Sequence, residues 1–317
     1  MMAKIALMFP GQGTQRVGMG RDLYNKYLKA REIIDIAGDE LKNIIFNGPE
    51  EVLKLSKYVQ PAIFTVSMAA FEVFKELYDI SVNDFVVAAG HSLGEYSALC
   101  AAGFFSFRDG LAMVKARGEF IQKASEENPG TMAAIIGLKK SVVECICKQV
   151  SNFGVCEPVN FNSPEQIVVA GSLLSVNKAI KLATIAGATK CIILNVSGPF
   201  HSSLMTSAAD DMSRELEKYI FNVPSFGVFT NCDALLTTDE LSVKKKLIKQ
   251  INNPVKWDDI ISNIIAADFD VFVEIGSGRV LSGLLKRIDI SKKVLNIEDS
   301  MSLQKTLLEL NRYETSR

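Results

Sequence analysis

The chain has 317 residues, of which 48% are hydrophobic and 22% charged, and these fractions are those of an average globular protein. This length predicts one or two domains with a sizeable core. The 35 lysines and arginines nearly balance the 36 aspartates and glutamates. Without a basic surplus, the composition argues against a nucleic-acid partner.

The cysteine and histidine content argues against a metal site. The six cysteines include no C-x-x-C pair and the chain has only two histidines, so no zinc site is expected. A disulfide framework is not expected at this length, and we predict reduced thiols in the cytoplasm. The first apolar run ends at Pro10, too early for a signal peptide, and no uncharged apolar run approaches the ~18 residues of a membrane span. We therefore expect no membrane partner.

Short apolar or β-branched runs alternate with helical patterns along most of the chain. Strands are predicted at 5–9, 85–89, 227–231, 271–274 and 294–297. Helices are predicted at 20–37, 61–78, 93–102, 107–126, 202–219, 238–251, 257–267 and 301–313. This alternation predicts an α/β fold with a mainly parallel sheet.

The middle of the chain has a different order of elements. Strands are predicted at 131–138, 155–161, 166–170 and 189–196, helices at 141–150 and 175–186, and a turn at 162–164. Ser141 is a candidate N-cap and Gly187 a candidate C-cap of the two helices. The resulting order β-α-β-β-α-β is that of a ferredoxin-like unit. We predict a small domain at 128–197 inserted into a larger domain at 1–127 and 198–317.

The segment Gly90-His91-Ser92-Leu93-Gly94 fits the pattern G-x-S-x-G, in which a strand-turn-helix elbow exposes a nucleophilic serine. An apolar strand precedes it and a helical pattern follows it, as this elbow requires. The alternative is a helix cap, in which Ser92 and Glu95 form a capping box. The cap leaves both glycines unexplained, whereas a sharp turn favours residues without Cβ. We therefore favour a nucleophilic Ser92.

A serine hydroxyl needs a base to become a good nucleophile, and the chain offers two histidines. His91 adjoins Ser92, and because side chains of neighbours on a turn usually diverge, we expect it at the rim of the site. His201 follows a loop and precedes a predicted helix, a common place for catalytic groups. We favour His201 as the base; a polar loop residue at a helix start is the alternative.

Arg117 lies on the predicted helix 107–126 without an acidic partner three or four residues away, where it flanks the apolar face. A partly buried guanidinium needs a carboxylate partner. Arg117 can bind the carboxylate of a substrate through its two parallel N–H donors. Alternatively, its stem covers apolar surface while its head stays in water.

Seven segments together carry a resemblance to a known family. They are FPGQGTQ at 9–15, GHSLGEYSAL at 90–99, RG at 117–118, NFNSPEQIVVAG at 160–171, PFHSSLM at 199–205, NPVKW at 253–257 and EIGSGRVLSGLLKRI at 274–288. Their order and spacing resemble the malonyl-CoA:acyl carrier protein transacylases of bacterial-type fatty acid synthesis over nearly the whole chain. The resemblance implies an α/β hydrolase-like large domain with a parallel sheet and an inserted ferredoxin-like small domain.

The resemblance also implies roles for individual residues. Ser92 would carry the acyl group, and His201 would act as base and then as acid, oriented by the main-chain carbonyl of Gln250. The backbone N–H groups of Gln12 and Leu93 would form the oxyanion hole. Further implied substrate-binding residues are Arg117 for the malonyl carboxylate, Phe200 for malonyl selectivity, and His91 and Asn162 within two of the motifs.

The implied reaction moves malonyl from malonyl-CoA to the phosphopantetheine thiol of acyl carrier protein through a malonyl-serine, by a ping-pong route without metal or cofactor. An acyltransferase of a polyketide pathway remains an alternative, as do a serine hydrolase and a non-catalytic carrier-binding domain. A hydrolase of the esterase class would need its histidine after the acidic triad member, late in the chain. Because carrier proteins of this kind are acidic, Lys244–Lys246 and Lys139–Lys140 are candidate contacts, or simply solvated surface.

Overall fold

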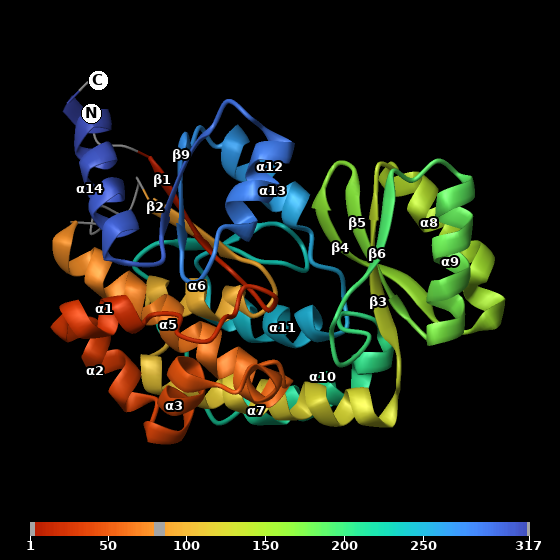
Figure 1. Cartoon of the computed structure of the whole chain (residues 1–317), viewed down its shortest axis with the longest axis horizontal. Helices are drawn as coiled ribbons and strands as arrows, with labels where there is room; N and C mark the ends of the chain where they lie inside the picture. Colours follow the sequence, from red (N-terminus) through yellow and green to blue (C-terminus); the bar gives the residue numbers. More distant parts are fainter. Residues whose placement is uncertain (1–3, 79–85, 316–317) are drawn as a thin grey trace.

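The computed structural model describes residues 4–78 and 86–315, and its centre is a sheet with the strand order β10-β9-β1-β2-β7-β8 (Figure 1). These strands are β1 (Ile5–Phe9), β2 (Val86–Gly90), β7 (Gly227–Phe229), β8 (Leu236–Thr237), β9 (Val271–Ile275) and β10 (Lys293–Ile297). All neighbouring strands are parallel except β7 and β8. Every residue of β1, β2 and β9 is buried, as expected for a parallel sheet covered on both faces.

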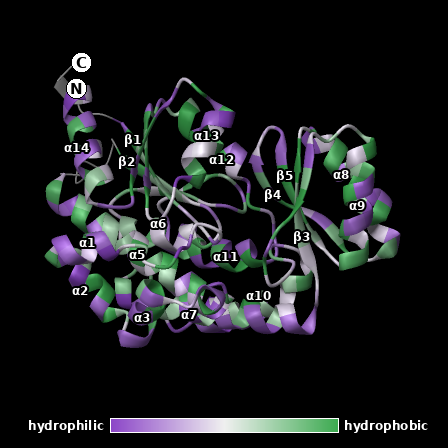
Figure 2. Cartoon of the chain, viewed as in Figure 1, coloured by the Kyte–Doolittle hydropathy of each residue, from purple (hydrophilic) through white to green (hydrophobic). Residues whose placement is uncertain are grey.

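Alternate residues of β1 show which helices cover each face of this sheet. Ile5, Leu7 and Phe9 belong to a hydrophobic cluster with one set of helices, whereas Ala6 and Met8 belong to a second cluster with α12 and α13. The first set is α1 (Arg21–Lys26), α2 (Leu28–Ile36), α3 (Asp39–Asn47), α4 (Glu50–Leu53), α5 (Ser56–Leu77), α6 (Gly94–Ala102), α7 (Phe107–Glu127), α10 (Thr206–Leu216), α11 (Glu240–Ile251) and α14 (Ser300–Thr315). The second is α12 (Trp257–Ala266) and α13 (Val280–Ile288). Hydrophobic and hydrophilic bands alternate along these helices in Figure 2, as amphipathic packing requires.

A second, antiparallel sheet has the strand order β4-β5-β3-β6 (Figure 1). Its strands are β3 (Thr131–Ile136), β4 (Cys156–Ser163), β5 (Gln166–Gly171) and β6 (Lys190–Ile193). Helices α8 (Lys140–Val150) and α9 (Leu173–Ile185) cover one face, and the chain order is β3-α8-β4-β5-α9-β6. The opposite face, which includes Met132 and Val168, packs against Phe200. This face of the small sheet therefore borders the segment of the large unit that contains Phe200.

The α/β architecture with a mainly parallel sheet confirms the prediction from the sequence, but several local predictions are wrong. Tyr27 has extended backbone angles and divides the predicted helix 20–37 into α1 and α2. Ser141 is not an N-cap, because Lys139 is the cap residue and α8 begins one residue later. Asn162 and Ser163 belong to β4 and not to a turn.

Other ends differ as well. The predicted helix 202–219 contains a 3₁₀ turn at Ser203–Met205 before α10, and α5 begins five residues before Pro61. Helices α3, α4 and α13 are additional to the predicted elements. Phe85, at the start of the predicted strand 85–89, lies outside the described residues. In the described ranges, the helices are too short or too polar to cross a membrane.

Helices α5 and α7 approach closely at Gly118. A Cβ at this position would be 2.6 Å from the backbone oxygen of Ser56, well inside van der Waals contact. The close approach brings the neighbouring Arg117 on α7 within hydrogen-bond distance of Gln60 on α5. The helix packing therefore decides where the guanidinium of Arg117 lies.

We predict opposite stability effects for alanine at two helical glycines. Gly118→Ala should lower the free energy of unfolding by ~1–3 kcal/mol, because α5 and α7 must move apart. Gly283→Ala in α13 is the matched control: its Cβ would meet nothing within 4 Å, so the free energy of unfolding should rise by up to ~1 kcal/mol. Urea unfolding followed by circular dichroism measures both. Equal stability of the two variants would contradict the packing argument.

Candidate active site

One cavity lies between the carboxyl ends of the parallel strands and the face of the small sheet that α8 and α9 do not cover. All the predicted site residues except Gln250 line it. The lining residues come from the loop after β1 (Gly11, Gln12, Thr14), the turn after β2 (His91, Ser92, Leu93), helices α5, α7 and α13 (Gln60, Arg117, Val280), the small sheet (Met132, Asn160, Asn162) and the segment before α10 (Phe200, His201). Segments far apart in the sequence thus meet at one site, as is usual at the strand ends of an open α/β sheet.

Ser92 lies at a sharp turn between β2 and α6. Its φ angle is 52°, in the left-handed region that a non-glycine residue rarely adopts. A Cβ on Gly94 would be 2.0 Å from the backbone oxygen of Phe9, and one on Gly90 would be 1.9 Å from the backbone of Gly94. Both glycines are therefore required by close backbone approach, which explains the G-x-S-x-G spacing.

The capping-box alternative is wrong for this turn. The N-cap of α6 is Leu93, and no side chain caps the helix. The Ser92 hydroxyl instead lies 2.7 Å from Nε2 of His201. The backbone N–H of Ser92 donates to Oδ1 of Asn231 at 2.8 Å, so a side chain from the loop after β7 holds the turn. The serine hydroxyl is thus left to face the histidine.

His201 is positioned from both ring nitrogens. Nδ1 lies 2.7 Å from the backbone oxygen of Gln250, an acceptor only, so Nδ1 carries the hydrogen. The lone pair of Nε2 then faces the hydroxyl of Ser92. Burial, followed by the positive charge of Arg117, lowers the pKa of His201 to about 3. The imidazole is therefore neutral near neutral pH, with the lone pair of Nε2 unprotonated.

Arg117 is 2% exposed, which contradicts the alternative of a side chain with its head in water. One terminal nitrogen donates to Oε1 of Gln60 at 2.6 Å; the other donates to Oε1 of Gln250 at 3.0 Å and to the hydroxyl of Ser92 at 3.2 Å. These partners are neutral amides and an alcohol, where the sequence predicted a carboxylate. Within the described ranges, Nε of Arg117 has no hydrogen-bond partner. A buried cation next to a serine, without a protein carboxylate as partner, can attract an anionic substrate.

A buried network behind the cavity fixes these orientations. Oε2 of Glu95 accepts from the backbone N–H of Asn231 at 3.0 Å and from Nε2 of Gln250 at 2.8 Å. Nε2 of Gln250 also donates to the backbone oxygen of Ser92 at 2.8 Å, so Oε1 of Gln250 must face Arg117. Burial raises the pKa of Glu95 to about 7. The network connects the serine turn to Gln250 near the end of α11. The backbone carbonyl of Gln250 accepts the hydrogen bond from His201.

The remaining predicted residues form the walls of the cavity. His91 Nε2 lies 2.8 Å from Oδ1 of Asn162, so these two side chains bind each other across the two sheets. Phe200 packs on the small sheet and lines the cavity. In the described part of the chain, the backbone N–H groups of Gln12 and Leu93 have no protein acceptor, although both residues line the cavity. These two donors are free to bind an oxygen of a ligand.

Two residues of this arrangement were not singled out by the sequence. Gln60 is 1% exposed on α5, and its position before Pro61 is the one local signal. Asn231 follows β7, at the strand end where polar functional groups gather. Both side chains form hydrogen bonds with residues that are distant in the sequence. A single sequence contains no pattern that predicts such long-range pairs.

Comparisons with known proteins agree with one another over nearly the whole chain. The family model described as acyl transferase domain matches residues 7–298. The malonyl CoA-acyl carrier protein transacylase of Bacillus subtilis is 40% identical over 98% of this chain and 99% of that protein. The transacylase of the same name from Escherichia coli K12 is 38% identical over 95% of this chain and 98% of that protein.

Solved structures agree. The crystal structure of acyl-carrier-protein-S-malonyltransferase from Bartonella henselae has a TM-score of 0.93 at 37% identity and covers 98% of this chain and 100% of that one. A malonyl-transacylase in complex with its holo type II PKS acyl-carrier protein has a TM-score of 0.92 at 36% identity, over 97% of this chain and 100% of that one. Each of these similarities spans both sheets and the cavity between them.

Proposed function

We propose that this chain moves a malonyl group from malonyl-CoA to the phosphopantetheine thiol of acyl carrier protein in fatty acid synthesis. The chain belongs to the acyl transferase domain family, together with the malonyl CoA-acyl carrier protein transacylases. The observation that carries the proposal is the position of the Ser92 hydroxyl. It lies within hydrogen-bond distance of a neutral imidazole and of a buried guanidinium at the same time. The first can activate the hydroxyl and the second can select an acyl group that ends in a carboxylate.

The proposed first half-reaction forms a malonyl-serine. Nε2 of His201 takes the proton of Ser92 as Oγ attacks the thioester carbonyl carbon. The N–H groups of Gln12 and Leu93 stabilise the resulting oxyanion, a contribution of about 3 kcal/mol for each donor in comparable sites. The carbon–sulfur bond then breaks, and the proton on His201 passes to the departing thiolate of coenzyme A. The products are free coenzyme A and acylated Ser92.

The second half-reaction runs the same steps in reverse order. The phosphopantetheine thiol of the carrier enters the cavity, and His201 removes its proton. The sulfur attacks the malonyl-serine carbonyl, and the serine oxygen leaves with the proton from His201. Every group needed for this cycle belongs to the chain or to the two substrates.

Arg117 is the proposed selectivity residue. Malonyl ends in a carboxylate, which accepts two parallel hydrogen bonds from a guanidinium. Gln60 and Gln250 hold the guanidinium so that it faces the serine. An acetyl group would leave the buried cation without an anionic partner, so it gains less from binding.

We also propose the domain division predicted above. The order β3-α8-β4-β5-α9-β6 with the sheet order β4-β5-β3-β6 supports a ferredoxin-like domain at 128–197. The parallel sheet and the serine turn after β2 support an α/β hydrolase-like domain at 1–127 and 198–317. The acyl site then lies between the two domains.

A polyketide carrier is the second candidate acceptor, because one similar structure contains a type II PKS acyl-carrier protein. The serine hydrolase fits less well, since a backbone carbonyl and not a carboxylate meets Nδ1 of His201. The structure reduces the number of lysines that are candidates for contact with a carrier. Lys246 pairs with Asp233, and Lys244 donates to a backbone oxygen, which leaves Lys245 as the exposed cation of that run.

The acyl-enzyme gives the first test of this function. After brief exposure to labelled malonyl-CoA, mass spectrometry should find one malonyl group on the peptide that contains Ser92, and Ser92→Ala should carry none. Added pantetheine should remove the group much faster than water does, because the proposed acceptor is a thiol. Faster release to water would identify a hydrolase, and an absence of label in the wild type would favour the non-catalytic domain.

Replacement of Arg117 tests the selectivity. Arg117→Ala should lower kcat/KM for malonyl-CoA by about 10²-fold, the effect of losing a charge-assisted pair of ~3 kcal/mol. The rate with acetyl-CoA should fall much less, so the malonyl-to-acetyl ratio of kcat/KM decreases. Arg117→Lys, which keeps the charge but not the paired donors, is the matched control and should lie between. An unchanged ratio in Arg117→Ala would rule out this role.

A further inference from the structure

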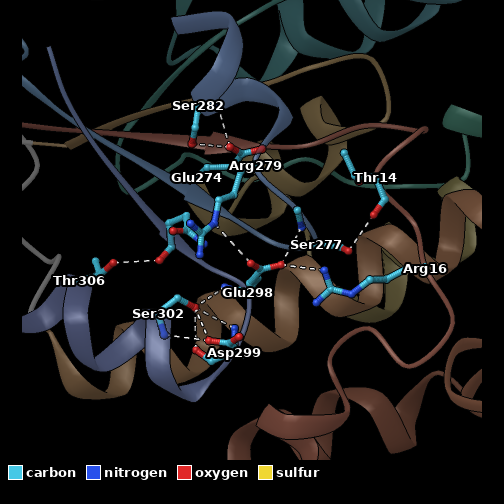
Figure 3. Close-up of polar contacts among 12 residues, drawn as sticks. Thr14, Arg16, Glu274, Ser277, Arg279, Ser282, Glu298, Asp299, Ser302 and Thr306 are labelled. Atoms are coloured by element: carbon cyan, nitrogen blue, oxygen red, sulfur yellow. Dashed lines mark hydrogen bonds and ion pairs between the residues drawn. The ribbon is translucent and has the colours of Figure 1, made fainter. Parts of the chain in front are cut away.

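Two exposed arginines share one carboxylate beside the cavity, in a cluster that the proposed mechanism does not use. Arg16 lies in the loop after β1, Arg279 precedes α13, and Glu298 follows β10 (Figure 3). Nη1 of Arg16 lies 2.9 Å from Oε2 of Glu298, and Nε of Arg279 lies 3.4 Å from Oε1 of Glu298. The two arginine side chains are 54% and 64% exposed, whereas that of Glu298 is 11% exposed. The carboxylate is therefore a mostly buried anchor for two guanidiniums that face solvent.

The backbone around the anchor is fixed by further contacts. The N–H of Gly278 donates to Glu298 at 3.3 Å, and the hydroxyl of Ser277 donates to the backbone oxygen of Thr14 at 2.8 Å. The second contact joins the loop that carries Arg16 to the loop that carries Arg279, as Figure 3 shows. Both loops thus hold their arginines at a set separation before any ligand binds.

The cluster keeps donors for an anion. Within residues 4–78 and 86–315, the contacts with Glu298 are the only polar contacts of these two guanidiniums, so most of their N–H donors face water. Two cations share one carboxylate. The nearby Asp299 accepts from the backbone N–H of Ser302 at the start of α14, where the helix dipole offsets its charge. The amides of Leu281 and Ser282, in the first turn of α13, are bound by Glu274 and are not available to an anion.

The cluster lies next to the cavity. Thr14, bonded to Ser277, lines the cavity, and so does Val280, the residue after Arg279. A thioester that reaches Ser92 is attached to a pantetheine arm, and this arm ends in a phosphate outside the cavity. Two guanidinium forks set around one point match the oxygens of a phosphate better than a single cation does.

We propose that Arg16 and Arg279 bind the phosphate at the outer end of the pantetheine arm, which coenzyme A and the carrier's phosphopantetheine have in common. This inference rests on the proposed malonyl transfer and adds a site for the end of the substrate that does not react. Glu298 is the positioning residue of the site, because it orders both side chains before the phosphate arrives. Recognition by exposed arginines weakens as salt rises.

Three malonyl donors distinguish recognition of the phosphate from recognition of the nucleotide. They are malonyl-pantetheine without phosphate, malonyl-phosphopantetheine with the shared phosphate, and malonyl-CoA with the nucleotide as well. The proteins are the wild type, the double variant Arg16→Gln/Arg279→Gln, and Arg31→Gln, an exposed arginine on α2, as control. For the double variant we expect KM to rise about tenfold for both phosphate-bearing donors at low salt, with kcat little changed. KM for malonyl-pantetheine should stay the same, as should all three values in Arg31→Gln. The double variant should also show a higher KM for holo acyl carrier protein.

An equal rise of KM for all three donors would overturn the inference, because the arginines would then only support the cavity wall. A rise for malonyl-CoA alone would also overturn it, since the arginines would recognise the nucleotide and not the shared phosphate. No change with any donor would show that the cluster is not a binding site. The proposed function fails by a different result, namely a wild-type protein that none of the three donors acylates.

Discussion

The site depends on the burial of the Arg117 guanidinium, which among the described residues has no carboxylate as a hydrogen-bond partner. The cation is held by amide oxygens of Gln60 and Gln250 and by the hydroxyl of Ser92. Burial alone already lowers the pKa of His201, and the fixed positive charge lowers it further. The same charge leaves a place that a carboxylate can fill. One cation therefore adds to the effect of burial on His201 and, in the proposed function, binds the carboxylate of the acyl group.

The fold supplies this arrangement through contacts that also stabilise the core. Gly118 allows α7 to lie against α5, and this packing brings Arg117 to Gln60. Glu95, in the first turn of α6, orients the side-chain amide of Gln250. The backbone carbonyl of Gln250 orients the histidine. The left-handed turn at Ser92 persists because Asn231 and the neighbouring backbone hold it. The contacts that bring Ser92, His201 and Arg117 together thus also pack the core.

Local patterns predicted the parallel α/β architecture and the serine turn, and they singled out His201 and Arg117, which the structure places at the Ser92 hydroxyl. Each of these features has a short-range signal. The partners of Arg117 had no such signal: Gln60 and Gln250 are far away in the sequence and meet it only through packing. The contact between His91 and Asn162 likewise depends on how the two sheets face each other. The break at Tyr27 and the strand at Asn162 show tertiary packing overriding a local preference. The roles of Gln12 and Leu93 as oxyanion donors stay predictions.

The most direct test of the central claim is an NMR titration of the imidazole of His201. The chain has two histidines, so selective labelling and a His91→Gln variant assign the signals. Because burial and Arg117 lower the pKa to about 3, His201 should stay neutral between about pH 5 and 8, and Arg117→Gln should raise its pKa. Below its unfolded pKa, the unfolded chain binds a proton that the folded chain does not, so this group should contribute a loss of stability as pH falls from 6.5. A wild-type His201 that titrates near 6.5, unchanged in Arg117→Gln, would contradict the account.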